Sequence, residues 1–216
     1  MNVLTELQQK ALKAFFSVSE LKKHFYLTGG TALSAFYLMH RFSDDLDLFT
    51  HSIEIDDIER IAVDAWKNSG LNPVKERGSP TYRRFLLNND LQVDLVKDID
   101  FRVGTPQLHQ SFMVDNPKNI AVNKVTALYG RFEPKDYVDL YFLKSHLSYN
   151  ILELLKLGMQ KDGGLEPFHW ARIVKDVENI TVLPRMLKPL ELSELKKFFM
   201  HLREEIIDSL KPKNST

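Results

Sequence analysis

The sequence contains no cysteine among its 216 residues. Disulfide bonds and zinc sites built on thiolates are therefore excluded, and an intracellular location is the expectation. The sequence also carries no net charge, because 29 Lys and Arg residues are matched by 29 Asp and Glu residues. No overall field draws the protein to nucleic acid or to a membrane surface, so any contact with a polyanion must come from a local patch.

Long hydrophobic runs are absent as well. No apolar segment approaches the roughly 20 residues that span a bilayer. The segment MNVLTELQQK lacks the basic part and the continuous apolar part of a secretory signal. Hydrophobic residues make up 44% of the sequence and charged residues 27%, which argues against disorder. We therefore expect a soluble, cytoplasmic, globular protein without a membrane segment.

The order of the elements indicates the α+β class. Apolar residues at helical or alternating spacing predict helices over residues 2–24 and 54–69 and strands over residues 72–77, 81–87 and 91–96. Gly104, Pro106 and Pro117 predict an irregular connection over residues 98–116, and the remainder of the chain reads as helices. We expect an α/β domain over residues 1–105 and a helical domain over residues 106–216.

The chain is organised around residues 25–50, FYLTGGTALSAFYLMHRFSDDLDLFT. In a strand, successive side chains point to opposite faces, so Asp45 and Asp47 share one face while Leu46 and Leu48 share the other. Two adjacent carboxylates favour a cation between them, and hard oxygen ligands suit Mg²⁺ or Mn²⁺. The alternative is a strand with one solvated face.

A Gly-Gly-Thr turn stands at the other end of this segment. Gly29 and Gly30 allow a sharp turn and a close approach of a ligand to the backbone, and Thr31 is expected to cap the next helix. The N–H groups at a helix N-terminus favour a phosphate. Such a turn also occurs without any ligand. Its combination with the Asp-x-Asp strand favours a nucleoside triphosphate site.

Three further polar residues belong to this prediction. Arg41 is either a dipole partner at the end of a helix or a contact to triphosphate oxygens or a carboxylate. Ser43 is expected to hydrogen-bond the turn. Asp94, in the strand LQVDLV, lies between apolar residues where an unpartnered charge is costly. It is either on a wet face or the third carboxylate of a metal site, brought beside Asp45 and Asp47 by strand pairing.

The helical part of the chain adds a lysine and two carboxylates. Lys124 lies on an apolar stripe, where a lysine is a candidate phosphate contact. Asp136 and Asp139 are three residues apart and share one helix face.

The segments LTGGTALSAFYLMHRFSDDLDLF, LQVDLV and NKVTALYGRFEPKDYVDLYFL resemble the AbiEii/AbiGii toxin family of minimal nucleotidyltransferases from abortive-infection and toxin–antitoxin systems. The resemblance runs from about Phe25 to Leu143. It implies an N-terminal nucleotidyltransferase-type mixed β-sheet flanked by helices and a C-terminal helical bundle that completes the active-site cleft. The superfamily commonly has Gly-Ser in the first turn, and here Gly30-Thr31 keeps the hydroxyl.

The resemblance also implies roles for individual residues. Asp45 and Asp47 would bind Mg²⁺ or Mn²⁺, and Asp94 would complete the metal site as a ligand or act as a base. The nucleotide would be held by residues of the first motif and by a lysine of the second: Gly29, Gly30, Thr31, Arg41, Ser43 and Lys124. Asp136 would be the catalytic carboxylate of the second motif, while Asp139 would hold Arg131 or the helix packing.

The expected reaction is the metal-dependent transfer of a nucleoside monophosphate from an NTP such as ATP or GTP to an acceptor hydroxyl. The resemblance suggests RNA as the acceptor, including the 3′ end of tRNA, and a separately encoded antitoxin as a partner.

Basic residues around one hairpin form a candidate RNA patch or merely discourage aggregation at a sheet edge: Lys75, Arg77, Arg83 and Arg84. The alternatives are a small-molecule nucleotidyltransferase of the antibiotic-modifying type, a nucleotide-binding regulator without turnover, and an α/β interaction domain with solvated aspartates.

Overall fold

The computed structural model describes residues 3–212, and contacts within the chain divide it into two compact units. The first unit runs to Asn116 and the second begins at Pro117. The first unit holds the sheet, and the regular elements of the second, over residues 117–212, are helices.

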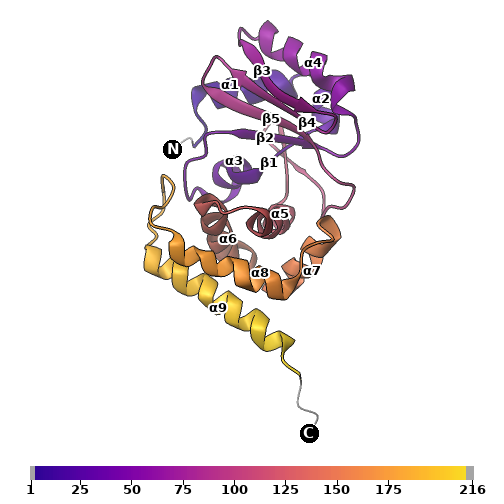
Figure 1. Ribbon diagram of the computed structural model, residues 1–216. Coiled ribbons are helices and arrows are strands. Elements are labelled where there is room, and N and C mark those ends of the chain that lie inside the picture. Colours follow the sequence, from indigo (N-terminus) through magenta and orange to yellow (C-terminus); the bar gives the residue numbers. More distant parts are fainter. Residues whose placement is uncertain (1–2, 213–216) are drawn as a thin grey trace. The chain divides into compact units, whose positions relative to one another are not determined.

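The first unit is built on a seven-stranded sheet with the order β3-β4-β5-β2-β1-β7-β6 (Figure 1). The strand β2 pairs in parallel with β5, and β1 pairs in parallel with β7, while the other neighbouring strands are antiparallel. The strands are β1 (Tyr26–Thr28), β2 (Leu46–Thr50), β3 (Pro73–Ser79), β4 (Tyr82–Leu87), β5 (Leu91–Lys97), β6 (Gln107–His109) and β7 (Phe112–Val114). This mixed sheet confirms the predicted α+β class.

The segment 98–116 is not the irregular connection that the sequence predicted, because it contains β6 and β7. These two strands form a hairpin in which His109 pairs with Phe112, and Gln110 has a φ of 56°. Strands of three residues are too short to show an alternation of apolar and polar residues. The glycine and prolines around them therefore led to the prediction of an irregular segment. The β7 strand extends the sheet beyond β1.

Three helices pack together against one face of the sheet: α1 (Glu6–Phe16), α2 (Ser19–His24) and α4 (Ile55–Asn68). The apolar residues of α4 recur at helical spacing and are buried at Ile58, Ala62 and Trp66. The Trp66 ring lies 5.4 Å from the Phe85 ring of β4 and 5.7 Å from the Phe15 ring of α1, measured between centroids. This aromatic cluster fixes which face of the sheet is covered.

The helix α3 (Gly29–Leu33) lies on the other side of the sheet from α4 and contacts β1 and β2 (Figure 1). It continues as the π-helical segment η1 (Ser34–Leu38), after which Met39 has a φ of 47°. One interpretation of the sequence placed Arg41 at the end of this helix. The left-handed backbone at Met39 ends it earlier and turns the chain back toward the sheet.

The second unit is a bundle of the helices α5 (Pro117–Gly130), α6 (Pro134–Leu147), α7 (Ile151–Lys161), α8 (Pro167–Ile173) and α9 (Leu192–Leu210), with the 3-10 helix η2 (Val174–Asn179). The helix α5 packs against α6, α7 and α8, and α9 packs against α6, α7, α8 and η2. The Tyr137 and Phe199 rings meet edge to face at 4.9 Å, and buried Trp170 donates its indole N–H to Val125 O (2.9 Å). The predicted C-terminal helical bundle is therefore present.

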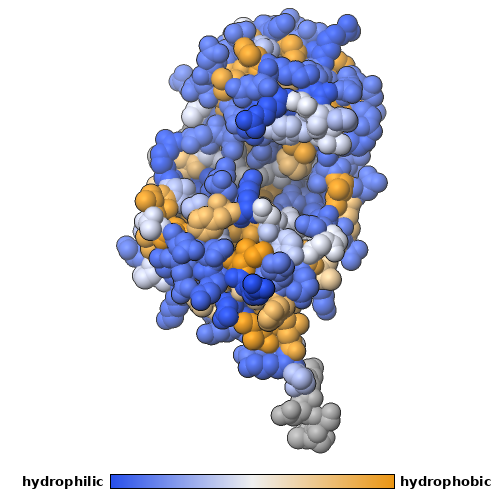
Figure 2. All heavy atoms as spheres, viewed as in Figure 1, coloured by the Kyte–Doolittle hydropathy of each residue, from blue (hydrophilic) through white to orange (hydrophobic). Residues whose placement is uncertain are grey.

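Hydrophilic side chains cover most of the face shown in Figure 2, with hydrophobic residues in small scattered groups. Across residues 3–212, each helix is too short or too polar to span a bilayer.

Candidate active site

A row of polar residues crosses five strands of the sheet in register. Thr28 pairs with Asp47, Asp47 with Asp94, Asp94 with Arg84, and Arg84 with Arg77. Residues paired in register point to the same face of a sheet, and neighbouring strands lie about 4.8 Å apart. The structure therefore brings Asp47 and Asp94 side by side, as the strand-pairing interpretation of the sequence requires. We call these five residues the polar row.

Asp45 lies one residue before β2, which begins at Leu46. Two hydroxyl groups hold the loop that carries it. Thr31 Oγ1 donates to the carbonyl oxygen of Asp45 (2.5 Å), and Ser43 Oγ donates to Asp45 Oδ1 (3.3 Å). Thr31 was expected to cap the following helix, but it lies inside α3 and ties that helix to the Asp45 loop instead.

The two glycines of α3 make room for the candidate site residues. Gly29 has a φ of +72°, and the carboxylate of Asp47 occupies the space that a Cβ at this position would take. A Cβ at Gly30 would overlap the Arg41 guanidinium and would lie 3.0 Å from Ser43 Oγ. Only glycine at both positions allows the carboxylate, the guanidinium and the hydroxyl to approach this backbone so closely.

Arg41 is almost completely buried, with 2% of its surface exposed. The helical segment ends at Leu38, and the guanidinium lies against Gly30 near the start of α3. Arg41 Nη1 also donates to Phe42 O (2.8 Å). A cation at a helix start does not complement the helix dipole. This position does not fit the interpretation of Arg41 as a dipole partner, and its contact with triphosphate oxygens or a carboxylate stays a prediction.

Asp94 is held by three neighbouring side chains. Arg84 binds it in a bidentate manner, with Nε 2.8 Å from Oδ1 and Nη2 2.8 Å from Oδ2. Tyr82 OH donates to Oδ1 (3.1 Å) and Gln92 Nε2 donates to Oδ2 (3.4 Å). Asp94 itself is only 7% exposed. The buried charge that the sequence indicated therefore has a partner of opposite sign.

The charge of Asp94 helps to keep Arg84 and Tyr82 protonated. Hydrogen bonds to Asp94 raise the pKa of Arg84 above its ordinary value. Burial, together with the charge of Asp94, raises the pKa of the Tyr82 hydroxyl. Arg84 therefore stays a cation and Tyr82 stays a hydrogen-bond donor at neutral pH.

The chemistry of the predicted metal ligands fits a hard divalent cation, because Asp45, Asp47 and Asp94 offer only carboxylate oxygens. In the part of the chain that the structure describes, however, no group of three or more His, Asp or Glu side chains is arranged to hold a metal ion. The donor set is present, but the third carboxylate is engaged by a guanidinium.

The four basic residues around the hairpin do not form one patch. Lys75 pairs with Glu59 on α4 (2.8 Å), and Arg83 pairs with Glu59 (2.6 Å) and Asp56 on the same helix. Arg84, the next residue, points to the opposite face and binds Asp94. Alternation along β4 therefore separates Arg83 from Arg84, which the sequence pattern had grouped together.

In the second unit, Lys124 lies between two carboxylates that are completely buried. Its Nζ is 2.6 Å from Asp136 Oδ1 and 2.6 Å from Asp139 Oδ2. Arg131 Nε donates to Asp136 Oδ2 (2.9 Å), so this arginine binds Asp136, and its predicted contact with Asp139 stays a prediction. Burial opposes the ionisation of Asp136, but the charges and hydrogen bonds of Lys124 and Arg131 outweigh it and lower its pKa.

Sequence reasoning missed a buried carboxylate close to the Gly-Gly turn. Asp115 is fully buried, accepts hydrogen bonds from Thr28 Oγ1 (2.8 Å) and Arg102 Nη2 (2.8 Å), and ties the polar row to the end of β7. Tyr37 OH donates to its carbonyl oxygen (2.8 Å). The apolar run FMV before Asp115 was the available signal, because it marks the short strand that delivers the carboxylate.

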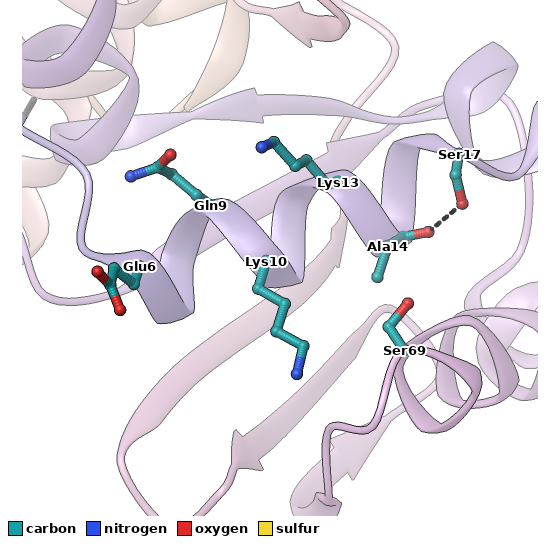
Figure 3. Close-up of a pocket in the computed structure, with 7 residues that line it drawn as sticks. All are labelled: Glu6, Gln9, Lys10, Lys13, Ala14, Ser17 and Ser69. Carbon is teal, nitrogen blue, oxygen red and sulfur yellow. Dashed lines mark hydrogen bonds between the residues drawn. The ribbon is translucent and has the colours of Figure 1, made fainter.

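A groove of about 500 Å³ lies along α1 and is lined by Glu6, Gln9, Lys10, Lys13, Ala14, Ser17 and Ser69 (Figure 3). In Figure 3, the dashed line marks the hydrogen bond from Ser17 Oγ to Ala14 O (2.8 Å). The predicted site residues do not line this groove. Its position gives it no part in the chemistry of the polar row.

Comparison with known sequences identifies the family of the chain and one relative. The family model for the nucleotidyl transferase AbiEii toxin of type IV toxin–antitoxin systems matches residues 10–208. A protein of uncharacterised function from Aquifex aeolicus (strain VF5), aq_aa25, is 32% identical over 168 residues, covering 74% of this chain and 77% of the relative.

Solved structures show the same fold. An H. pylori protein assigned as a nucleotidyltransferase has a TM-score of 0.64 at 16% identity and covers 96% of this chain and 97% of its own. JHP933 from Helicobacter pylori has a TM-score of 0.63 at 19% identity, and the match covers 95% of this chain and 90% of JHP933. The antibiotic-resistance factor ANT(2″)-Ia has a TM-score of 0.51 at 10% identity, and the match covers 72% of this chain and 92% of that factor.

Proposed function

The chain belongs to the AbiEii family of nucleotidyltransferase toxins from type IV toxin–antitoxin systems, and from this premise we propose a metal-dependent transfer of a nucleoside monophosphate from an NTP to an RNA hydroxyl. The protein is a nucleotidyltransferase, and membership of a toxin–antitoxin family implies an antitoxin. The proposal concerns the metal, the acceptor and the residues that act.

The single observation that carries the proposal is the placement of Asp47. Its carboxylate lies in register beside Asp94 and fills the space above Gly29. A carboxylate platform therefore adjoins the glycine turn at the start of α3, where the Asp47 carboxylate lies against Gly29 and the Arg41 guanidinium lies against Gly30. An NTP needs both features, because its phosphates seek N–H groups and cations, and its reaction requires neutralisation of negative charge.

The residues of the first unit would have the following roles. Asp45 and Asp47 would hold Mg²⁺ or Mn²⁺, with Asp94 as a third ligand or as the base that accepts the proton of the acceptor hydroxyl. A divalent cation would supply charge neutralisation at the triphosphate. The triphosphate would be held by residues of the turn and its surroundings: Gly29, Gly30, Thr31, Arg41 and Ser43.

The reaction itself requires little covalent chemistry from the protein. The acceptor oxygen bonds to the α-phosphorus, the bond between that phosphorus and the bridging oxygen breaks, and pyrophosphate leaves with the electron pair. Positioning and charge neutralisation supply the rate enhancement. The family resemblance supports Lys124 as a phosphate contact and Asp136 as the catalytic carboxylate of the second motif. In the structure Lys124 Nζ lies 2.6 Å from Asp136 Oδ1.

The test uses purified protein, total cellular RNA, Mg²⁺ and each α-labelled NTP in turn. Wild type is compared with the double variant Asp45→Ala/Asp47→Ala and with Asp44→Ala, a control that removes an exposed carboxylate from the same loop. We expect label in one class of RNA with wild type and Asp44→Ala, and none with the double variant.

Other outcomes would count against parts of the proposal. Label that persists in a folded double variant would overturn the assignment of Asp45 and Asp47. Pyrophosphate release without labelled RNA, in the presence of a small molecule or a protein, would overturn the RNA acceptor and leave the nucleotidyl transfer intact.

A further inference from the structure

Asp94 has no hydrogen-bonding capacity left for another partner. An ionised carboxylate offers about four lone-pair positions, two on each oxygen. In the structure Oδ1 accepts from Tyr82 OH and Arg84 Nε, and Oδ2 accepts from Arg84 Nη2 and Gln92 Nε2. A metal ion binds through these same lone pairs, so it can reach Asp94 only if one of the donors leaves.

Arg84 is the donor that a metal ion would displace. Tyr82 and Gln92 are neutral and can remain beside a cation, whereas the guanidinium of Arg84 would stand next to a divalent charge in a region of low water content. The side chain of Arg84 is 25% exposed, so it has a path to solvent. Charge repulsion from the metal ion would therefore push Arg84 away from Asp94, and the exposed side chain could move into solvent.

We propose that Arg84 and a divalent cation compete for the carboxylate of Asp94, so that Arg84 sets the metal affinity of the active site. The inference rests on the proposed function, because it requires that Asp94 is a metal ligand. Arg84 is a positioning residue in this scheme: it holds Asp94 in place before the metal binds and is exchanged when the metal arrives.

The consequence for metal binding has a definite sign. If Arg84 merely supported Asp94, its removal would weaken metal binding or leave it unchanged. If Arg84 competes, its removal frees two lone-pair positions and removes a like charge, so metal binding becomes stronger. The released guanidinium has the geometry to bind a phosphate in a bidentate manner, which would link metal loading to nucleotide loading.

The test measures the binding of Mn²⁺ alone by calorimetry and by the electron paramagnetic resonance signal of free Mn²⁺, at low ionic strength and without nucleotide. We expect Arg84→Gln to bind Mn²⁺ about tenfold more tightly than wild type, which corresponds to about 1.4 kcal/mol. Arg77→Gln is the matched control, because Arg77 is the next member of the polar row and is exposed. Its Mn²⁺ affinity should equal that of wild type.

Two further variants complete the design. Arg84→Lys keeps the charge but loses the bidentate geometry, so its affinity should lie between wild type and Arg84→Gln, and it serves if Arg84→Gln does not fold. In an Asp94→Asn background, Arg84→Gln should no longer change the Mn²⁺ affinity, because the contested carboxylate has been removed.

The outcomes separate this inference from the proposed function. Mn²⁺ binding to wild type that is unchanged or weakened in Arg84→Gln would overturn the competition and leave the metal site intact. Absence of Mn²⁺ binding in wild type and in both folded Arg84 variants would overturn the metal site and the inference together. Binding that appears only in the Arg84 variants would support the inference in its strongest form.

Discussion

The Asp47 carboxylate occupies the position where a side chain at Gly29 would begin. Gly29 also has a φ of +72°, in the left-handed region that disfavours other residues. Two independent constraints therefore meet at one glycine. The first concerns backbone conformation and the second concerns the placement of a candidate catalytic carboxylate.

Replacement of Gly29 by alanine tests both constraints. We expect Gly29→Ala to lower the free energy of unfolding by about 1–2 kcal/mol, because the left-handed backbone is strained with a Cβ. We also expect it to abolish RNA labelling, because Asp47 must move. The measurements are urea unfolding and incorporation of the α-label per folded molecule.

Gly130→Ala is the control for this substitution. Gly130 has no neighbouring atom within 4 Å of an added Cβ, and alanine favours the helix α5 that it ends. Its stability and labelling should match or exceed those of wild type. Full labelling by a folded Gly29→Ala protein would contradict the proposed placement of Asp47.

The turn at Gly29 and the strands that carry Asp47 and Asp94 could be predicted from the sequence, because each depends on residues that are close together in the chain. Glycine and aspartate have strong positional meaning, so the segments containing Gly29, Asp47 and Asp94 predicted their turn and strands correctly. Strand pairing then brought the two aspartates into register. The family resemblance and the α+β class, both predicted from the same segments, are confirmed by the family match and the mixed sheet.

The parts that could not be predicted depend on contacts between distant residues. The partners of Arg83 and Arg84 follow from which face of β4 is covered by α4, and one sequence does not show that face directly. The buried Asp115 follows the three-residue strand β7, which is too short for a periodic signal and is marked only by its apolar composition. The early end of the helix before Arg41 depends on one left-handed residue, Met39, which is not a typical helix terminator.

Lys124 is expected to be essential for the stability of the second unit as well as for the reaction. Lys124→Met would leave Asp136 and Asp139 buried without their shared cation, and breaking such a buried pair costs about 3–5 kcal/mol. Urea unfolding of the full chain measures this loss.

The matched control for Lys124 is Lys118, which lies on the same helix and pairs with Glu153 at the surface (2.7 Å). Exposed pairs contribute about 0–1 kcal/mol, so Lys118→Met should change stability little. Equal effects of the two substitutions would contradict the structural role of the buried cluster.

The lowered pKa of Asp136 predicts how stability depends on pH. Because the folded pKa lies below the unfolded value of about 3.9, the unfolded state binds more protons in this range and stability rises with pH. The contribution of Asp136 is fully present above the unfolded pKa and is lost as the pH falls through the folded pKa.

The measurement compares wild type with Asp136→Asn, since the difference cancels other groups that titrate equally in both proteins. The gap in unfolding free energy should be largest at pH 5–7 and should narrow below about pH 4, where the carboxyl group of Asp136 in the unfolded state takes up a proton while the folded state still holds it ionised. A gap that stays constant from pH 6 to pH 2 would show that the charge of Asp136 does not stabilise the fold.

Arg83 and Arg84 are adjacent in the sequence but should differ in their effects. Arg83 lies on the α4 side of the sheet, where it binds Glu59 and Asp56. Loss of a charged hydrogen bond of this kind costs about 1.5–3 kcal/mol, so Arg83→Gln should lower the free energy of unfolding while RNA labelling per folded molecule stays close to wild type. Arg84→Gln should instead shift the dependence of labelling on Mn²⁺ concentration toward lower values. A loss of RNA labelling in folded Arg83→Gln, at unchanged Mn²⁺ dependence, would mean that this arginine contacts the acceptor despite its partners on α4.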